Sequence, residues 1–281
     1  MQIVKSIEEV RSIVRGWRKE GLRVGLGPTL GYLHEGHKSL IVKAVSENDR
    51  VVVSDFVNPT QFGANEDLES YPRDIERDAA ICEAAGASLV FHPEPEEMYF
   101  PDNCTFVDMD GLTKGLCGKS RPTHFRGVCT VVSKLFHIVM PDRAYFGQKD
   151  AQQLAVIRRM VRDLNFEITI VGCPIVREKD GLAMSSRNTY LNAEERKAAL
   201  ILHKSLQAAE ALMQTGERDV AVIKAAIVER MKTEPLARID YVEIVDAETL
   251  EDAAAIERPV LAATAVYIGK TRLIDNFIFE V

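Results

Sequence analysis

Residues 23–37, RVGLGPTLGYLHEGH, give the strongest indication of the fold class. Residues 23–26 have the composition of a short strand, and Gly27 with Pro28 is typical of the place where a strand ends. A helix beginning near His34 would follow this turn directly. A strand, a glycine-containing turn and a helix start in this order predict the opening of a βαβ arrangement.

The same alternation continues through the first two thirds of the chain. Short apolar runs predict strands at residues 51–57, 88–92, 144–146 and 166–171, and helical spacing predicts helices at 39–45, 73–85, 125–139 and 151–164. Continuous apolar strands separated by helices predict an α/β fold with a doubly wound, Rossmann-like parallel sheet. Ligands of such sheets bind at the carboxyl ends of the strands, so we expect the chemistry there.

The pattern changes after Pro174. Asn192 followed by Glu195 predicts a helix start, and Leu202, Leu206, Ala209 and Leu212 line one face of the helix that follows. A second helix is predicted near residues 220–231, and strands at 239–245, 260–268 and 272–279 alternate without long crossovers. We therefore predict two domains, residues 1–176 with the parallel sheet and residues 177–281 as a smaller α+β domain acting as a lid.

Composition limits the class of protein. The chain has 281 residues, of which 46% are hydrophobic and 27% charged, so a large core is expected rather than disorder. The net charge of −7 disfavours a protein that works by gripping nucleic acid. No secretory signal and no apolar run of about 18 residues are seen, so we expect a cytoplasmic protein without membrane contact. The five cysteines form no metal-binding or disulfide pattern and are interpreted as structural thiols.

His34, Gly36 and His37 give the turn after the first predicted strand its chemical character. If a helix begins near His34, its first N–H groups and its dipole form an anion site, and Gly36 allows a phosphate to approach closely. The two imidazoles are three positions apart and would face the same bound group, where they could stabilise developing negative charge. Two histidines also suit zinc, but no third ligand has suitable spacing.

Residues 147–150, GQKD, predict a second corner between a strand and a helix at the same edge of the sheet. Lys149 can supply a compact positive charge to phosphates, and Asp150 can accept hydrogen bonds from ribose hydroxyls. Taken alone, such a sequence is also common in ordinary turns.

Residues 179–188, KDGLAMSSRN, lie at the predicted domain junction. Loops of small residues that carry a cation commonly close over phosphates, with Arg187 neutralising charge while Ser185 and Ser186 donate hydroxyls. A polar linker is the alternative interpretation of this loop.

Several long blocks, taken in this order, resemble the pantoate:β-alanine ligase (pantothenate synthetase) family. The blocks are PTLGYLHEGH at 28–37, FVNPTQF at 56–62, HFRG at 124–127, PDRAYFGQKD at 141–150, DGLAMSSRN at 180–188 and RLIDN at 272–276. This family belongs to the nucleotidyltransferase superfamily, shared with class I aminoacyl-tRNA synthetases. The resemblance therefore implies a sheet of the nucleotidyltransferase type.

The resemblance implies a two-step ligase that is a homodimer. Pantoate and ATP, with Mg²⁺, would form pantoyl adenylate and pyrophosphate, and β-alanine would then attack the activated carbonyl to give pantothenate and AMP. A carboxylate attacking a phosphate brings two anions together, so catalysis must rest on positioning and charge stabilisation rather than on a protein nucleophile. The sequence identifies no protein ligand of Mg²⁺, most of whose ligands could be phosphates and water.

The resemblance also implies roles for single residues. His37 matches the proton donor, and the other catalytic positions are His34, Lys149, Ser185, Ser186 and Arg187. The matched substrate-binding amides are Gln61, Gln153 and Asn58, with Gln61 also near β-alanine. Such neutral amides can donate to the oxygens of pantoate and accept from its hydroxyls without an ion pair to its carboxylate. The ATP-binding positions are Leu30, Gly31, Tyr32, Leu33, His34, Glu35, Gly36, His37, Gly147, Gln148, Lys149, Asp150, Val176, Met184, Ser185, Ser186 and Arg187.

Three positions depart from the expected pattern. Leu30 stands where the family usually has methionine, and Thr123 stands where it usually has glycine. Asp55 interrupts an apolar run, where a buried carboxyl needs a partner or a raised pKa. We expect Asp55 to lie near the sheet edge and to make a local hydrogen bond.

Two other functions compete with the ligase. A nucleotidyltransferase of the cytidylyl or adenylyl type would release a nucleotide-linked product. A nucleotide-binding sensor without turnover would keep the phosphate-binding backbone but lose its cationic and imidazole groups. His34, His37, Lys149 and Arg187 are all present, which disfavours the sensor.

Overall fold

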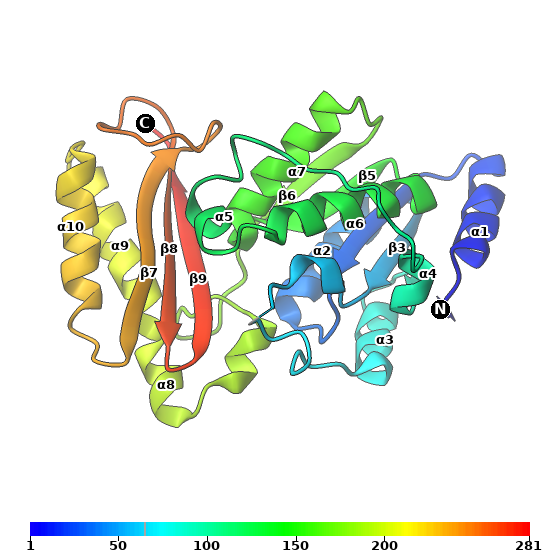
Figure 1. The fold of residues 1–281 in the computed structure, drawn as a ribbon, viewed down its shortest axis with the longest axis horizontal. Coiled ribbons are helices and arrows are strands. Elements are labelled where there is room, and N and C mark those ends of the chain that lie inside the picture. Colours follow the sequence, from blue (N-terminus) through cyan, green and yellow to red (C-terminus); the bar gives the residue numbers. More distant parts are fainter. Residues whose placement is uncertain (65) are drawn as a thin grey trace. The chain divides into compact units, whose positions relative to one another are not determined.

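The computed structural model describes residues 1–64 and 66–281 and contains two compact units (Figure 1). Unit 1 comprises residues 1–110, 121–148 and 153–174, and unit 2 comprises residues 111–120, 149–152 and 175–281. Two short segments that precede residue 176 therefore cluster with the C-terminal part of the chain.

Unit 1 is built on a six-stranded parallel sheet. Its strands, in sheet order, are β1 (Gln2–Val4), β4 (Leu89–Phe91), β3 (Arg50–Asp55), β2 (Val24–Thr29), β5 (Arg143–Gly147) and β6 (Thr169–Cys173). β2 pairs with β3 on one side and with β5 on the other. The chain order thus reverses beside β2, and the carboxyl ends of β2, β3 and β5 lead into the segments singled out from the sequence.

Helices complete the doubly wound arrangement. The helices of unit 1 are α1 (Ile7–Lys19), α2 (Glu35–Glu47), α3 (Ile75–Ala84), α4 (Pro95–Met98), α6 (His124–Val139) and most of α7 (Ala151–Asp163), with the 3-10 turn η1 (Pro59–Gln61). The 3-10 turn η2 (Gln148–Asp150) lies where the chain passes from unit 1 to unit 2. α2 contacts β2, β3, β5 and α3, whereas α1 and α6 contact β2 and each other. Strands covered in this way are buried on both faces, which explains the three consecutive valines, residues 51–53, in the middle of β3.

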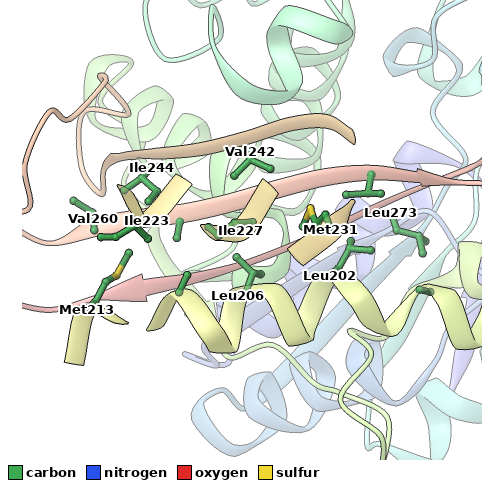
Figure 2. Close-up of a cluster of buried hydrophobic side chains, with 14 of the residues drawn as sticks. Leu202, Leu206, Met213, Ile223, Ile227, Met231, Val242, Ile244, Val260 and Leu273 are labelled. Atoms are coloured by element: carbon green, nitrogen blue, oxygen red, sulfur yellow. The ribbon is translucent and has the colours of Figure 1, made fainter. Parts of the chain in front are cut away.

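Unit 2 is a smaller α+β assembly. Its sheet is antiparallel, with β8 (Val260–Ile268) between β7 (Ala237–Asp246) and β9 (Thr271–Phe279). α9 (Leu200–Gln214) and α10 (Val220–Met231) pack on this sheet, and Figure 2 shows Leu206, Ile227 and Val242 within their shared core. The remaining elements are α5 (Leu116–Ser120), η3 (Ser186–Tyr190) and α8 (Ala193–Ala198).

The predicted fold class is confirmed, but several element boundaries are wrong. The strand predicted to stop at Gly27 and Pro28 continues to Thr29, and the strand predicted at residues 166–171 lies at Thr169–Cys173. The single helix expected after Asn192 is divided at Ala199 into α8 and α9, although the predicted Asn192–Glu195 capping box is present. β1 and α1, which precede the first strand predicted from the sequence, were not predicted.

Two further observations concern the cysteines and the length and apolarity of the helices. All five cysteines are free thiols, and four of them are buried. Within residues 1–64 and 66–281, no helix combines the length and apolarity that crossing a bilayer requires.

Candidate active site

The corner between β2 and α2 is held in an unusual backbone conformation. Gly31 and Tyr32 both have positive φ, of 81° and 50°. The Asp78 carboxylate, from α3, accepts from the Tyr32 N–H at 2.5 Å and the Leu33 N–H at 2.7 Å. A left-handed turn of this kind is costly for tyrosine, so the buried carboxylate is what holds the two N–H groups in place. Gly31 is required here, because a Cβ would lie 2.5 Å from Asp55 Oδ1.

His34 and His37 begin α2 as an imidazole version of a capping box. His34 Nδ1 accepts from the Gly36 N–H at 3.1 Å, and His37 Nδ1 accepts from the His34 N–H at 3.3 Å. A backbone N–H can only donate, so each Nδ1 must be unprotonated and each neutral ring carries its hydrogen on Nε2. The rings stack with centroids 4.0 Å apart. The corner therefore places two Nε2–H donors, on stacked rings, at the N-terminus of a helix, a suitable arrangement for an anion.

A pair of buried carboxyls lies beneath this corner. Burial raises the pKa of Asp78 to about 6; the Leu33 and Tyr32 N–H groups act against this, while the neighbouring Asp55 adds to it. Asp55 is the last residue of β3 and is 4% exposed. Asp55 lies at the carboxyl edge of the sheet as expected, but its partner is not local: His92, 37 positions away, donates from Nδ1 to the Asp55 carbonyl at 2.9 Å, and the same atom lies 3.5 Å from Asp55 Oδ1. The hydrogen bond between the Asp55 side chain and His92 also raises the pKa of His92.

Gln61 ends η1 just beyond the carboxyl end of β3, and α6 fixes its backbone. His124 Nδ1 and Arg121 Nη2 donate to the Gln61 carbonyl at 3.0 and 3.3 Å. At Gly127, a Cβ would collide with the carbonyl of Thr60 and with Gln61 Cα, so α6 approaches this turn at backbone contact.

The ion pair between Arg121 and Glu66 braces the same turn. Both side chains are largely buried, and two hydrogen bonds of 2.5 and 2.6 Å join them. Burial acts against ionisation of Glu66, but the hydrogen bonds and charge of Arg121 outweigh it and lower the pKa of that carboxyl. The block HFRG thus acts on Gln61 through its backbone. Thr123, before this block, has a φ of −96°, so the departure from glycine there requires no strained conformation.

The remaining predicted substrate amides of unit 1 differ in their surroundings. Asn58 is 1% exposed and donates to Gln61 Oε1. Gln153 is half-buried in the first turn of α7, which follows β5. Gln148 lies directly after the same strand.

Lys149 and Asp150 belong to unit 2. The Lys149 carbonyl accepts from Asn276 Nδ2 at 2.8 Å, so β9 holds the backbone of this corner. Lys149 Nζ lies 3.7 Å from Asp150 Oδ2, and the lysine side chain is 21% exposed.

The loop around residues 176–188, also in unit 2, is tightly braced. Arg177 makes two hydrogen bonds of 2.7 and 2.9 Å to the buried Asp275 and one of 3.1 Å to the Gly181 carbonyl. The Val176 carbonyl accepts from the Met184 N–H at 3.0 Å, so one of its lone pairs is already engaged. This loop is therefore an ordered element rather than a simple linker.

The serines and the arginine of this loop begin η3. Ser185 Oγ accepts from the Arg187 N–H at 3.3 Å as the N-cap, and Ser186 is buried. Arg196 supports the other side of the loop, where its hydrogen bond lowers the pKa of Asp180.

The predicted site residues thus fall into two groups. Unit 1 contains residues 30–37, 58, 61, 147, 148 and 153, whose elements meet at one edge of the parallel sheet. Unit 2 contains Lys149, Asp150, Val176 and residues 184–187. That the two groups converge on one triphosphate stays a prediction.

Comparison with known proteins gives a consistent result. The family model described as pantoate-beta-alanine ligase matches residues 2–278. The chain belongs to the pantoate-beta-alanine ligase family. It is 64% identical over 280 residues to a pantothenate synthetase of Enterococcus faecalis, covering 100% of this chain and 99% of that one. It is 62% identical over 281 residues to one of Clostridium acetobutylicum, covering 100% of both chains.

Solved structures of this family have the same fold. The crystal structure of pantothenate synthetase from Thermus thermophilus matches with a TM-score of 0.93 at 46% identity and covers 99% of both chains. The pantoate-beta-alanine ligase of Francisella tularensis matches with a TM-score of 0.82 at 34% identity, over 99% of this chain and 97% of that one. That ligase was solved in complex with beta-gamma ATP and beta-alanine.

A protein-held metal ion does not fit the described residues of this family member. Among residues 1–64 and 66–281, no three His, Cys, Asp or Glu side chains gather as metal ligands would. Both histidines of the corner use Nδ1 for backbone N–H groups, which also disfavours the zinc alternative.

The sequence does not single out the residues that hold the predicted site residues in place. Asp78 holds the β2–α2 corner, and Tyr99 bonds to Asn58, yet neither stands in a block used for the resemblance. The one available signal was a charged residue, Asp78, on the apolar face of a predicted helix. The sequence gives no indication of what Asp78 binds, because its partners, Leu33 and Tyr32, lie 45 and 46 positions away.

Proposed function

We propose that this chain is an AMP-forming pantoate:β-alanine ligase that makes pantothenate through a pantoyl-adenylate intermediate. The observation that carries the proposal is the β2–α2 corner, where His34 and His37 present Nε2–H donors at a helix N-terminus. Adenylation builds negative charge on the phosphate under attack, and donors fixed in advance stabilise that charge. The family supplies the identity of the substrates.

In the first step, the pantoate carboxylate attacks the α-phosphate of ATP and pyrophosphate leaves. Gln61 and Gln153 hold pantoate, and His37 donates to the phosphate. No protein nucleophile is needed, because the substrate itself provides the attacking oxygen. In the second step, the amine of β-alanine attacks the activated carbonyl, AMP leaves, and pantothenate is formed.

Unit 2 supplies the positive charge in this proposal. Lys149 and Arg187 neutralise the triphosphate, Ser185 and Ser186 donate to it, Asp150 accepts from the ribose, and the backbone at Val176 contacts adenine. We divide the chain functionally at residues 176 and 177, with the C-terminal part closing over ATP as a lid. The support for this division is that Lys149 and residues 184–187 belong to the same compact unit.

Three further parts of the proposal follow from the family. Mg²⁺ accompanies ATP and takes its ligands mainly from phosphates and water, since the described side chains offer no metal cluster. The enzyme works in the cytoplasm, where ATP is made. It is a homodimer, which light scattering at micromolar concentrations tests directly.

Product analysis tests the function. Purified protein is incubated with ATP, Mg²⁺, pantoate and β-alanine, and AMP and pyrophosphate are measured together. The ligase releases both, and AMP release requires β-alanine. Pyrophosphate without AMP would favour a nucleotidyltransferase that keeps the nucleotide in its product, and neither product would favour a sensor without turnover.

A further inference from the structure

The orientation of the buried Asn58 amide is fixed by the backbone around it. Its Oδ1 faces the Thr60 N–H at 3.4 Å, and its Nδ2 faces the Gly127 carbonyl at 3.3 Å. A backbone N–H only donates and a backbone carbonyl only accepts, so exchanging oxygen and nitrogen would break both contacts. At 1% exposure, water cannot compensate for that loss.

Two hydroxyls strengthen the same orientation. Tyr99 Oη donates to Asn58 Oδ1 at 2.8 Å, and Thr60 Oγ1 donates to it at 3.0 Å. Burial raises the pKa of Tyr99, although the Thr60 hydroxyl acts against this, so the phenol stays protonated and remains a donor at neutral pH. All polar atoms of the Asn58 side chain are thus engaged by protein groups.

The fixed Asn58 amide determines which end of Gln61 faces away from it. Asn58 Nδ2 lies 3.1 Å from Gln61 Oε1, and a donor must face an acceptor there. The Nε2 group of Gln61, with its two N–H bonds, is therefore the end that remains. Within residues 1–64 and 66–281, no protein acceptor contacts that group, which leaves its N–H bonds to water or to a ligand. A ligand that displaces water there must offer this group an acceptor, because an unpaired donor would otherwise lose its hydrogen bonds.

We propose that Tyr99 and Asn58 are positioning residues that lock the Gln61 amide as a hydrogen-bond donor. The hydroxy acid must then offer Gln61 an oxygen lone pair, from its carboxylate, from the carbonyl derived from it or from a hydroxyl oxygen, rather than a hydroxyl hydrogen. This inference rests on the proposed function, in which Gln61 holds the hydroxy acid. It also changes the expected role of Asn58, which acts on the substrate through Gln61 rather than by contact.

Two variants test this proposal. In N58D, a carboxylate oxygen replaces Nδ2 and faces Gln61 Oε1 and the Gly127 carbonyl, so the Gln61 amide should turn and present its oxygen to the substrate. In Y99F, one of three donors to Asn58 Oδ1 is lost while the aromatic packing remains. The matched controls are N103D, in a loop asparagine, and Y267F, in unit 2.

The readout is a preference between two ligands. Affinity is measured by calorimetry for pantoate and for its primary amide, in which an –NH₂ donor replaces a carboxylate oxygen. Wild type should prefer the acid, and N58D should shift the acid-to-amide affinity ratio by about 100-fold toward the amide, as expected for exchanging a good donor–acceptor pair for a clash. A merely structural role would weaken both ligands equally and leave the ratio unchanged.

Y99F keeps the test decisive if N58D does not fold. Loss of one neutral hydrogen bond should raise the KM for pantoate in ATP–pyrophosphate exchange by about two- to tenfold. The KM of Y99F for ATP should stay at the wild-type value. The Y267F control should keep the wild-type melting temperature. An unchanged pantoate KM in Y99F, or an unchanged ligand ratio in folded N58D, would overturn the proposal. Absence of AMP formation by wild type would instead overturn the proposed function.

Discussion

At the scale of single residues, His37 has two tasks that a substitution can separate. Its Nδ1 accepts from the His34 N–H and so helps to begin α2, while its Nε2–H is the group proposed to donate to a phosphate. Glutamine at this third helical position can also accept from the N-cap N–H, as in an ordinary capping box, but it provides no imidazole. The helix start and the chemistry can therefore be tested independently.

We expect His37→Ala to lower the adenylation rate by about 10² to 10³, as measured by ATP–pyrophosphate exchange, with a smaller change in ATP affinity. The donor should strengthen its contact only as charge develops in the transition state. His37→Gln should restore the lost stability of His37→Ala without restoring the rate. A rate within threefold of wild type in either variant would remove His37 from the mechanism.

The buried carboxyl pair predicts an unusual pH dependence of stability. The pKa of Asp78 is raised to about 6, so between about pH 4 and 6 the folded state binds more protons than the unfolded state. Stability should consequently fall as pH rises through this window. The raised pKa of His92 acts in the same direction, because its attraction to Asp55 is lost as the ring deprotonates.

Asp55→Asn should remove much of this dependence. The amide keeps an acceptor for His92 and adds a donor that Asp78 can accept from, while the repelling charge is lost. Urea unfolding from pH 4.5 to 7.5 should show the free energy of unfolding of the variant rising relative to wild type as pH increases. Asp102→Asn, at an exposed loop position, is the control. Parallel pH curves for wild type and Asp55→Asn would contradict the interpretation that Asp55 helps to raise the pKa of Asp78.

Local sequence patterns sufficed to single out His34 and His37, but they did not reveal the residues that hold the site in place. Strand, turn and helix start are contiguous in residues 23–37, so their chemistry could be predicted from neighbours alone. Asp78 and Tyr99 act across 45 and 41 positions, and only the folded sheet brings them to the β2–α2 corner and to Asn58. Pair contacts at such separations leave no periodic signal in one sequence.

At the scale of elements, the contact between α6 and η1 controls the position of Gln61. A methyl group at Gly127 would meet the backbone of Thr60 and Gln61, which cannot move aside as a flexible side chain can. We expect Gly127→Ala to cost about 1–3 kcal/mol of stability in urea unfolding and to raise the pantoate KM more than the ATP KM.

The control is Gly16→Ala in α1, where a Cβ would meet no atom within 4 Å. Alanine is the better helix former, so this variant should gain about 0.5–1 kcal/mol and leave both KM values unchanged. If the two variants behave alike, glycine at 127 has no special packing role.

Element boundaries were harder to predict than element types. β2 continues through Pro28 because its pairing with β5 ends at Leu26, so a missing N–H beyond that point costs no ladder bond on that side. The break at Ala199 between α8 and α9 has no glycine or proline to announce it. α1, in contrast, does carry a signal in the sequence, the capping box of Ser6 and Glu9.

At the scale of the whole molecule, the chain passes between its two units five times, after residues 110, 120, 148, 152 and 174. The sequence predicts a lid that moves about one hinge, because the change of pattern after Pro174 marks only one of these five crossings. Segment 111–120 packs within unit 2 through Leu116, Val245 and Leu261. Any closure must therefore act through several connections, which favours a small displacement over a large swing.

Closure over ATP predicts protection of the loop around Lys179. That lysine is exposed, and the residues proposed to hold phosphates follow it in the same unit. If trypsin cleaves an opened loop that cannot bind ATP, ATP at about 100 times its Kd should slow cleavage by about 100-fold. Lys232, exposed just after α10, should be cut at the same rate with and without nucleotide. Equal rates at Lys179 would show that ATP binds without ordering this loop, and equal protection of both lysines would indicate a general gain in stability instead of local closure.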